Sequence, residues 1–200
     1  MRQKIITIVI LSMVFALFLP LSAIAQDKPD KYIVVRMGKY SPTGELDDYD
    51  FKGKENAEFM FGHHFSPNFV LEGGFVVFIN EFKQAGVEVD IDGLALLLTA
   101  KGVYPMEKFE FFGGGGIGLY QGQMDIYGIP SFDYSEEETV FGFHIMIGAS
   151  YDITQNWYLA LEAKHHWTQE ADYKADLPTF PGVKMDLNGF GITFGIGWRF

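Results

Sequence analysis

Few residues in this chain have the type and spacing that catalysis requires. A histidine precedes a serine by two residues at His64-Phe65-Ser66, where a base within reach of the hydroxyl could activate it as a nucleophile. Pro67 follows immediately, so we expect Ser66 to lie in a tight turn, and no other residue supplies a convincing base. The chain has no cysteine, which excludes disulfides, thiolate metal sites and a cysteine nucleophile. The sequence therefore predicts no catalytic residues.

The histidines could in principle bind a metal ion. Two adjacent pairs, His63-His64 and His165-His166, lie in segments expected to be strands. Neighbouring residues of a strand point to opposite faces, so neither pair can chelate one ion. His64, His144 and His166 are expected to face the interior, where hydrogen bonding explains them better than a metal site does. We therefore expect neither a metal nor a cofactor.

A run of glycines from Gly113 to Gly116 is the other conspicuous motif. It lacks the Lys-Ser/Thr pair and the following helix that a phosphate-binding loop needs. The run instead predicts a strand that bends sharply or packs closely against interior side chains.

The segments that would position these residues alternate between apolar and small or polar side chains. In the last segment one face carries only apolar residues, namely Phe190, Ile192, Phe194, Ile196, Trp198 and Phe200. The opposite face carries glycines, Thr193 and Arg199, and similar alternation recurs in 69–80, 141–152 and 157–167. Glycine and charge in the middle of the polar face favour a barrel lumen over the core of a two-sheet sandwich.

Counting such segments gives eight strands and two classes of connection. The strands are expected near 31–40, 54–65, 69–80, 87–103, 108–121, 138–152, 157–169 and 185–200. Tight turns rich in Pro and Asn are expected at 66–68, 104–107 and 153–156, and longer loops at 41–53, 81–86, 122–137 and 170–184. Short and longer connections alternate, which predicts an all-β fold, an eight-stranded antiparallel up-and-down transmembrane β-barrel with its tight turns in the periplasm.

The first 25 residues are typical of a secretory signal peptide. Arg2 and Lys4 precede an apolar stretch over 5–19, and Ala23-Ile24-Ala25 has the small-x-small pattern of a cleavage site. A transmembrane anchor is the alternative. Residues 1–25 are thus expected to be removed and 26–200 to form the barrel domain, which predicts an integral protein of a bacterial outer membrane.

The charge balance of the mature chain argues against one class of partner. Without Arg2 and Lys4, 13 basic residues face 26 acidic ones, a formal charge of −13. Nucleic-acid phosphates would be repelled, so we expect no nucleic acid to bind.

Charged residues on the lumen face are the candidate site. Four cations and four anions share it by parity: Arg36, Lys101, Lys164, Arg199, Glu58, Glu72, Glu110 and Glu162. Equal numbers in a narrow barrel predict ion pairs that fill it, because an unpaired charge in a partly dry interior costs several kcal/mol. A ring of charge that selects ions in a narrow pore is the alternative.

Aromatic residues next to the tight turns are expected to mark the periplasmic membrane interface. These are Phe69, Tyr104, Trp157, Tyr158 and Phe200.

The sequence resembles the small outer-membrane barrels grouped around OmpA, OmpX and OmpW. The residues that carry the resemblance are Tyr151-Asp152-Ile153-Thr154-Gln155-Asn156-Trp157, Leu159-Ala160-Leu161-Glu162 and the closing Gly195-Ile196-Gly197-Trp198-Arg199-Phe200. Val35-Arg36-Met37-Gly38, with Pro42 beyond, is similar to the start of OmpW-like chains. The resemblance implies that the barrel-assembly machinery reads the terminal aromatic strand, with Phe200 as the assembly signal.

The resemblance also implies a structural or envelope-maintenance role without catalysis. A narrow channel for small hydrophobic solutes or ions, as in OmpW-like proteins, is the alternative. Phe78, Leu97, Val103 and Phe112 are expected to face inward and would suit such a channel or a simple core. Lipid A deacylases of this architecture use a His-x-Ser motif that opens toward the outer leaflet, whereas Ser66 is expected at the periplasmic end.

Acidic residues are concentrated in the loops expected to face outward. They are Glu45, Asp47, Asp48, Asp50, Asp125, Asp133, Glu136, Glu137, Glu138, Asp172 and Asp176. They could hold divalent cations that bridge to lipopolysaccharide phosphates, form a solvated acidic surface, or give the protein an adhesin or receptor role. Outer-membrane lipid and lipopolysaccharide are the expected surroundings of a monomer.

Overall fold

The computed structural model describes residues 29–44, 47, 52–84, 87–129, 132–173 and 183–200. The strands are β1 (Lys31–Pro42), β2 (Lys52–Ser66), β3 (Phe69–Gln84), β4 (Val87–Met106), β5 (Phe109–Ile129), β6 (Phe132–Asp152), β7 (Trp157–Thr168), β8 (Glu170–Tyr173), β9 (Val183–Asp186) and β10 (Gly189–Arg199). Within these residues no helix is long and apolar enough to cross a membrane.

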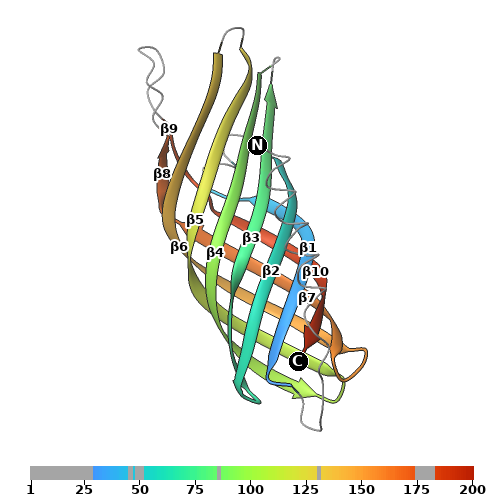
Figure 1. The fold of residues 1–200 in the computed structure, drawn as a ribbon. Helices are drawn as coiled ribbons and strands as arrows, with labels where there is room; N and C mark the ends of the chain where they lie inside the picture. The colour runs from blue at the N-terminus through green and yellow to red at the C-terminus, as the bar shows by residue number, and fades with distance from the viewer. Residues whose placement is uncertain (1–28, 45–46, 48–51, 85–86, 130–131, 174–182) are drawn as a thin grey trace.

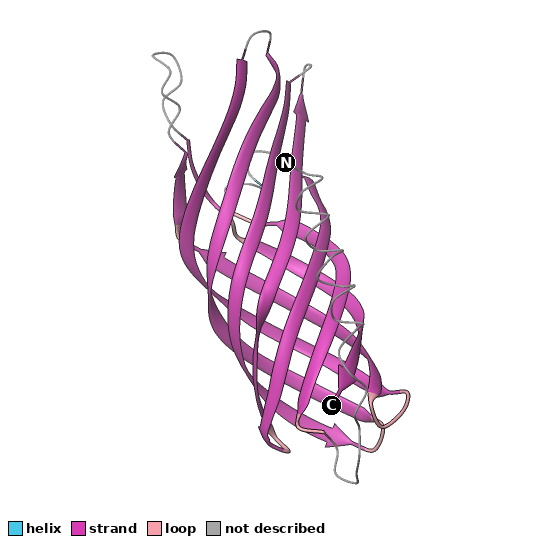
Figure 2. Cartoon of the chain, viewed as in Figure 1, coloured by secondary structure: helices cyan, strands magenta, loops and turns pink. Residues whose placement is uncertain are grey.

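Eight of the strands close into one antiparallel barrel, in the order β1-β10-β7-β6-β5-β4-β3-β2 (Figures 1 and 2). The predicted fold class is confirmed. The short turns and Phe200 lie at one end, which we call the turn end, and the tips of the long hairpins lie at the other, which we call the loop end. Because every barrel strand has two neighbours, no main-chain edge is left open to the lipid.

The strands run further toward the loop end than predicted. Most of the segments 81–86 and 122–137, expected to be loops, is strand, since β3 pairs with β4 as far as Gln84↔Val87 and β5 with β6 as far as Ile129↔Phe132. Main-chain hydrogen bonds between two strands can continue where the side chains no longer alternate between apolar and polar. The strands therefore extend beyond the residues whose alternation predicted them. The predicted loop 170–184 also contains β8 and the start of β9, which pair only with each other, and the last barrel strand begins at Gly189 and not at 185 as predicted.

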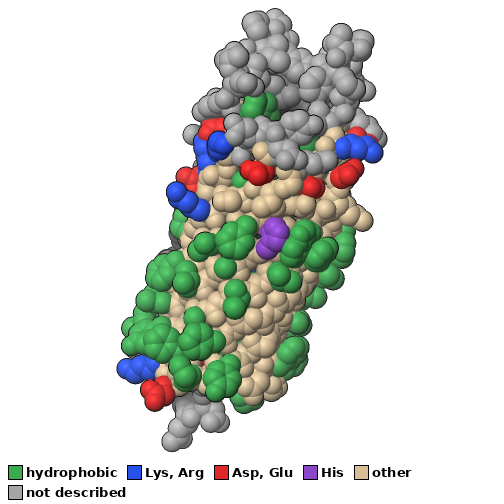
Figure 3. Space-filling model, turned by 180° about the vertical axis from the view of Figure 1, so that it is seen from behind, with side chains coloured by type: hydrophobic (Ala, Val, Ile, Leu, Met, Phe, Trp, Pro, Cys, Tyr) green, Lys and Arg blue, Asp and Glu red, His purple; other side chains and the backbone are tan. Residues whose placement is uncertain are grey.

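The alternation of side chains matches the two environments of a membrane barrel. Outward residues such as Ile147 and Phe194 are 69% and 56% exposed, whereas Val34 and Met60, which face inward, are buried. Figure 3 shows hydrophobic side chains in a broad band, with acidic and basic side chains gathered toward the two ends. The band is the surface that would contact lipid.

The turn end is closed by short connections that asparagine side chains brace. Asn68 donates from Nδ2 to the carbonyl oxygen of Val103 at 3.0 Å, and Asn156 from Nδ2 to that of Arg199 at 2.9 Å. An amide side chain in a turn can thus replace a main-chain hydrogen bond to the next strand.

The turn expected at 104–107 is shorter than predicted, because β4 continues to Met106 and the chain reverses at Glu107, whose φ is 53°.

Glycines on the inner face of the barrel are required by close packing. A Cβ on Gly116 would lie 2.0 Å from the Leu98 carbonyl oxygen, whereas a Cβ on outward-facing Gly113 would meet nothing nearer than the Met146 carbonyl oxygen at 3.7 Å. We expect Gly116→Ala to lower the free energy of unfolding by about 1–3 kcal/mol, because β4 and β5 must move apart. Gly113→Ala, the matched control, should leave it unchanged or slightly higher. Urea unfolding of both variants measures this, and equal effects would contradict the packing argument.

The β8–β9 hairpin stands next to β6 at the loop end, and we call it the cap (Figure 1). Its Ala171, Tyr173 and Met185, with Leu187 just after it, are buried in the same core as the inward barrel residues. The Tyr40 hydroxyl donates to the Leu187 carbonyl oxygen at 3.1 Å, which ties the cap to β1. Part of the loop end of the lumen is therefore filled by side chains of the cap and by Leu187.

Candidate functional site

Six charged side chains meet in the middle of the lumen, and we call them the central cluster. They come from five strands: Arg36 (β1), Glu58 (β2), Glu72 (β3), Lys101 (β4), Glu162 and Lys164 (β7). Three cations face three anions, so the cluster is neutral overall. Each side chain is at most 6% exposed, so each pair attracts far more strongly than it would in water.

Arg36 is the centre of the cluster. Its Nε lies 2.8 Å from Glu58 Oε2, its Nη1 2.9 Å from Glu162 Oε2 and its Nη2 3.4 Å from Glu72 Oε1. A guanidinium group has donors on three nitrogens in one plane, so it can join carboxylates that approach from three strands.

The two lysines complete the pairing. Lys101 Nζ lies 2.6 Å from Glu72 Oε2 and 3.5 Å from Glu162 Oε2. Lys164 Nζ lies 3.0 Å from both Glu58 Oε1 and Glu162 Oε1. Glu162 thus contacts all three cations of the cluster, and removing its charge would leave each of them with one fewer partner.

The two remaining predicted charges form a separate group near the turn end, which we call the terminal cluster. Arg199 places Nη2 2.9 Å from Glu110 Oε2 and Nη1 2.5 Å from Asp152 Oδ1, and its guanidinium lies 4.3 Å above the ring of Tyr158. Ser150 donates to Glu110 at 3.5 Å. The structure therefore brings the eight predicted charges into two groups instead of one network.

Sequence reasoning missed two members of these groups and misplaced one. Tyr32 donates to Glu72 Oε2 at 2.7 Å, and Asp152 pairs with Arg199; strand parity alone puts Asp152 on the inner face. Tyr158 was expected at the lipid interface and is instead 5% exposed inside the barrel. It follows Trp157, which is exposed, and adjacent strand residues cannot share a face.

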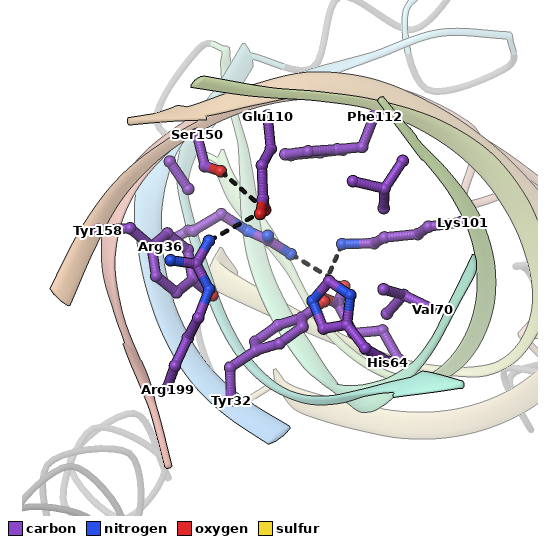
Figure 4. Close-up of a pocket in the computed structure, with 13 residues that line it drawn as sticks. Tyr32, Arg36, His64, Val70, Lys101, Glu110, Phe112, Ser150, Tyr158 and Arg199 are labelled. Atoms are coloured by element: carbon purple, nitrogen blue, oxygen red, sulfur yellow. Dashed lines mark hydrogen bonds and ion pairs between the residues drawn. The ribbon is translucent and has the colours of Figure 1, made fainter. Parts of the chain in front are cut away.

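Little open space is left around the clusters. A cavity of about 30 Å³ is lined by Arg36 and Lys101 of the central cluster and by Glu110 and Arg199 of the terminal cluster (Figure 4). A second cavity, of about 10 Å³, lies beyond the central cluster next to Lys164. One water molecule needs about 10–15 Å³, so these spaces hold only a few.

The inward apolar residues lie above and below the central cluster. Phe78, Leu97 and Val103 are buried, and Phe112 packs against the same core. The charged groups of the central cluster lie between Phe78 and Leu97 on one side and Val103 and Phe112 on the other.

The histidines and Ser66 are not assembled into a reactive group. His144 is buried and its Nε2 lies 2.8 Å from Thr99 Oγ1, while His166 Nε2 lies 2.9 Å from the Tyr40 hydroxyl. Ser66 is exposed and its Oγ accepts from the main-chain nitrogen of Asn68 at 3.3 Å. Among the described residues, no group of three His, Asp or Glu side chains could hold a metal ion.

Several earlier expectations fall on parts of the chain that the structure does not describe. The signal peptide over 1–25 lies there, as do Glu45, Asp48, Asp50 and Asp176. Asp125, Asp133, Glu136, Glu137, Glu138 and Asp172 are in strands and not in loops.

A family model described as outer membrane protein beta-barrel domain matches residues 11–200. This chain belongs to that family. Its barrel is similar to that of Neisserial surface protein A, with 12% identity, a TM-score of 0.63 and coverage of 85% of this chain and 97% of that one. It is also similar to OprG from Pseudomonas aeruginosa, with 12% identity, a TM-score of 0.57 and coverage of 86% and 97%. It is similar as well to a major outer membrane protein from Thermus thermophilus, with 9% identity, a TM-score of 0.58 and coverage of 86% of this chain and 98% of that one.

At these identities the solved structures show the shared fold alone. None of the curated protein sequences matches this chain. Membership of the outer membrane protein beta-barrel family places the protein in a bacterial outer membrane.

Proposed function

We propose that this outer-membrane barrel has a structural role in the envelope and that its lumen does not conduct. The observation that carries the proposal is the central cluster, in which six buried charges from five strands join across the lumen. A conducting pore needs a continuous path of water or weak binding sites. Here the polar groups that could line such a path are bound to one another.

The cap supports the same role from the loop end. Leu187 and Tyr173 are at most 1% exposed, so apolar side chains obstruct the loop end of the lumen in addition to the charge pairs below. A solute would have to pass both obstructions to cross.

Single-channel recording tests this proposal directly. The refolded barrel in a planar bilayer is expected to give no discrete openings, and vesicles that contain it should take up a small hydrophobic solute no faster than empty ones. Protection of the inserted barrel from protease confirms that silence is not failed insertion. Discrete openings or protein-dependent uptake would favour the channel and overturn the structural role.

The chain offers no support for an enzyme among its described residues, and we propose that the protein is not one. Ser66 is exposed in its turn, whereas His64 faces the lumen, where its ring centroid lies 5.7 Å from that of Tyr32. Lipopolysaccharide should be recovered unmodified after incubation with the barrel, and loss of an acyl chain that disappears in Ser66→Ala would contradict this.

We also propose Phe200 as the assembly signal of a monomeric barrel. Phe200 stacks on Trp198 with ring centroids 4.8 Å apart, and its main-chain nitrogen donates to the Lys31 carbonyl oxygen at 2.9 Å. Phe200→Ala should lower the amount of inserted barrel in cells severalfold, because the terminal ring is presented for recognition. The same variant refolded from urea should keep nearly the wild-type stability, and a large loss there would assign Phe200 to packing only.

A further inference from the structure

The interior between the central cluster and the cap has an aromatic floor. The floor consists of Tyr40, Phe78, Tyr120 and His166. Tyr40 stacks on Phe78 with centroids 4.8 Å apart and on His166 at 5.3 Å, and Tyr120 lies 5.3 Å from His166. Four rings from four strands thus form one layer across the lumen, directly above the charges.

Polar groups in this region are buried without partners. Asn56 Oδ1, both side-chain polar atoms of Asn80 and the Tyr120 hydroxyl make no hydrogen bond with any described group. These three residues are at most 4% exposed. Each buried polar atom without a partner costs about 1–3 kcal/mol, so their retention points to an additional hydrogen-bonding group that binds there.

Asn56 and Tyr120 also line a space beside the aromatic floor. The cavity of about 10 Å³ is bounded by Asn56, Phe78, Tyr120 and His166, with Lys164 on its lower side. Asn80 lies one inward position above Phe78 on β3, toward the cap. The unpaired amides and hydroxyl therefore belong to one region of the lumen.

The cap fills the mouth of this region with an aromatic ring of its own. A Cβ on Gly122 would lie 2.3 Å from the Tyr173 hydroxyl and 3.0 Å from Leu187, so the glycine leaves the room that these side chains occupy. Gly122 is one inward position above Tyr120. The hydroxyl of Tyr173 is buried and makes no hydrogen bond with any described group.

We propose that the interior around the aromatic floor, between the central cluster and the cap, is a binding site for a small aromatic molecule with one hydrogen-bonding group, of the phenol or indole class. In the closed barrel the side chains of Tyr173 and Leu187 occupy the room beside Gly122 that such a ligand would need. Displacement of the cap admits the ligand from the loop end, where its ring packs on the aromatic floor and its polar group pairs with the Asn56 and Asn80 amides. The central cluster blocks passage of the ligand from this site toward the turn end.

The site is tested with 4-fluorophenol and ¹⁹F NMR on the full barrel in detergent. The cap variant Tyr173→Ala/Leu187→Ala should bind 4-fluorophenol at least tenfold more tightly than the wild type, because the competing side chains are gone. Adding Asn80→Leu to the cap variant should weaken binding at least fivefold, because an amide partner is lost. Protein-free micelles give the partitioning background, and protease resistance shows that each variant is folded.

A matched control separates the site from the lipid-facing surface. Tyr104→Ala removes an aromatic residue that is 67% exposed at the turn end, and it should leave 4-fluorophenol binding unchanged. Equal affinity in the wild type and the cap variant, or an Asn80→Leu variant that binds as well as its parent, would overturn the proposal. The cap variant should still give no conductance; openings there would contradict the non-conducting lumen and leave the binding result to stand separately.

Discussion

Replacing Glu162 with glutamine is expected to lower the free energy of unfolding of the barrel by about 3–5 kcal/mol. The carboxylate contacts Arg36, Lys101 and Lys164, and it is fully buried. The amide keeps the size of the side chain but removes its charge, so three cations would share two carboxylates in an interior that screens charge poorly. Urea unfolding followed by tryptophan fluorescence measures the change.

An exposed glutamate provides the control for this substitution. Glu170 lies in β8 and its side chain is exposed, so Glu170→Gln should change the free energy of unfolding by less than about 0.5 kcal/mol. Should Glu162→Gln unfold at the same urea concentration as the wild type, the central cluster would contribute nothing to stability and the ion-paired lumen would be wrong.

Arg36→Met should destabilise the barrel by at least as much, and Glu162→Gln should then partly restore it. The single change leaves two lysines with three carboxylates around the space that the guanidinium occupied. The second change returns the cluster to two charges of each sign. Glu162→Gln is therefore expected to stabilise in the Arg36→Met background although it destabilises the wild type, so the interaction energy must exceed the loss of about 3–5 kcal/mol that Glu162→Gln causes in the wild type.

The sign of this second-site effect is the decisive observation. A double-mutant cycle of the wild type, both single variants and the double variant gives it from urea unfolding. If Arg36→Met does not refold, recovery of a protease-resistant barrel in the double variant would show the same stabilising effect of Glu162→Gln. Additive losses would show that packing around Arg36, and not charge balance, holds the cluster.

Much of the barrel was predictable because the direction of a side chain in a strand follows from parity. Glu72, Lys101 and Glu162 were assigned to the lumen from the alternation of their neighbours, and the structure buries all three there. The ends of the strands were not predictable in the same way. Gln84 and Ile129 lie in ladders that extend past the apolar band, and main-chain hydrogen bonds leave no pattern in the sequence.

The cap was missed for a related reason. Segment 170–184 has no apolar alternation long enough to indicate a membrane strand, so it was assigned to a loop. Ala171 and Tyr173 are nevertheless buried, because a short hairpin turns its few apolar residues into the barrel at the loop end. Burial of these residues depends on the assembled barrel strands against which they pack, and no single segment of the sequence shows that arrangement.

The sequence by itself determined that the chain forms a closed barrel and which charges its strands turn inward, since both follow from periodicity and parity. Only the tertiary structure decided which of those charges touch. Arg36 on β1 reaches Glu162 on β7 although β10 lies between the two strands, and Arg199 pairs with Glu110 and Asp152 instead of joining the central cluster. Contacts across a lumen depend on the stagger of strands around the barrel and on side-chain reach, and neither is a property of any one strand.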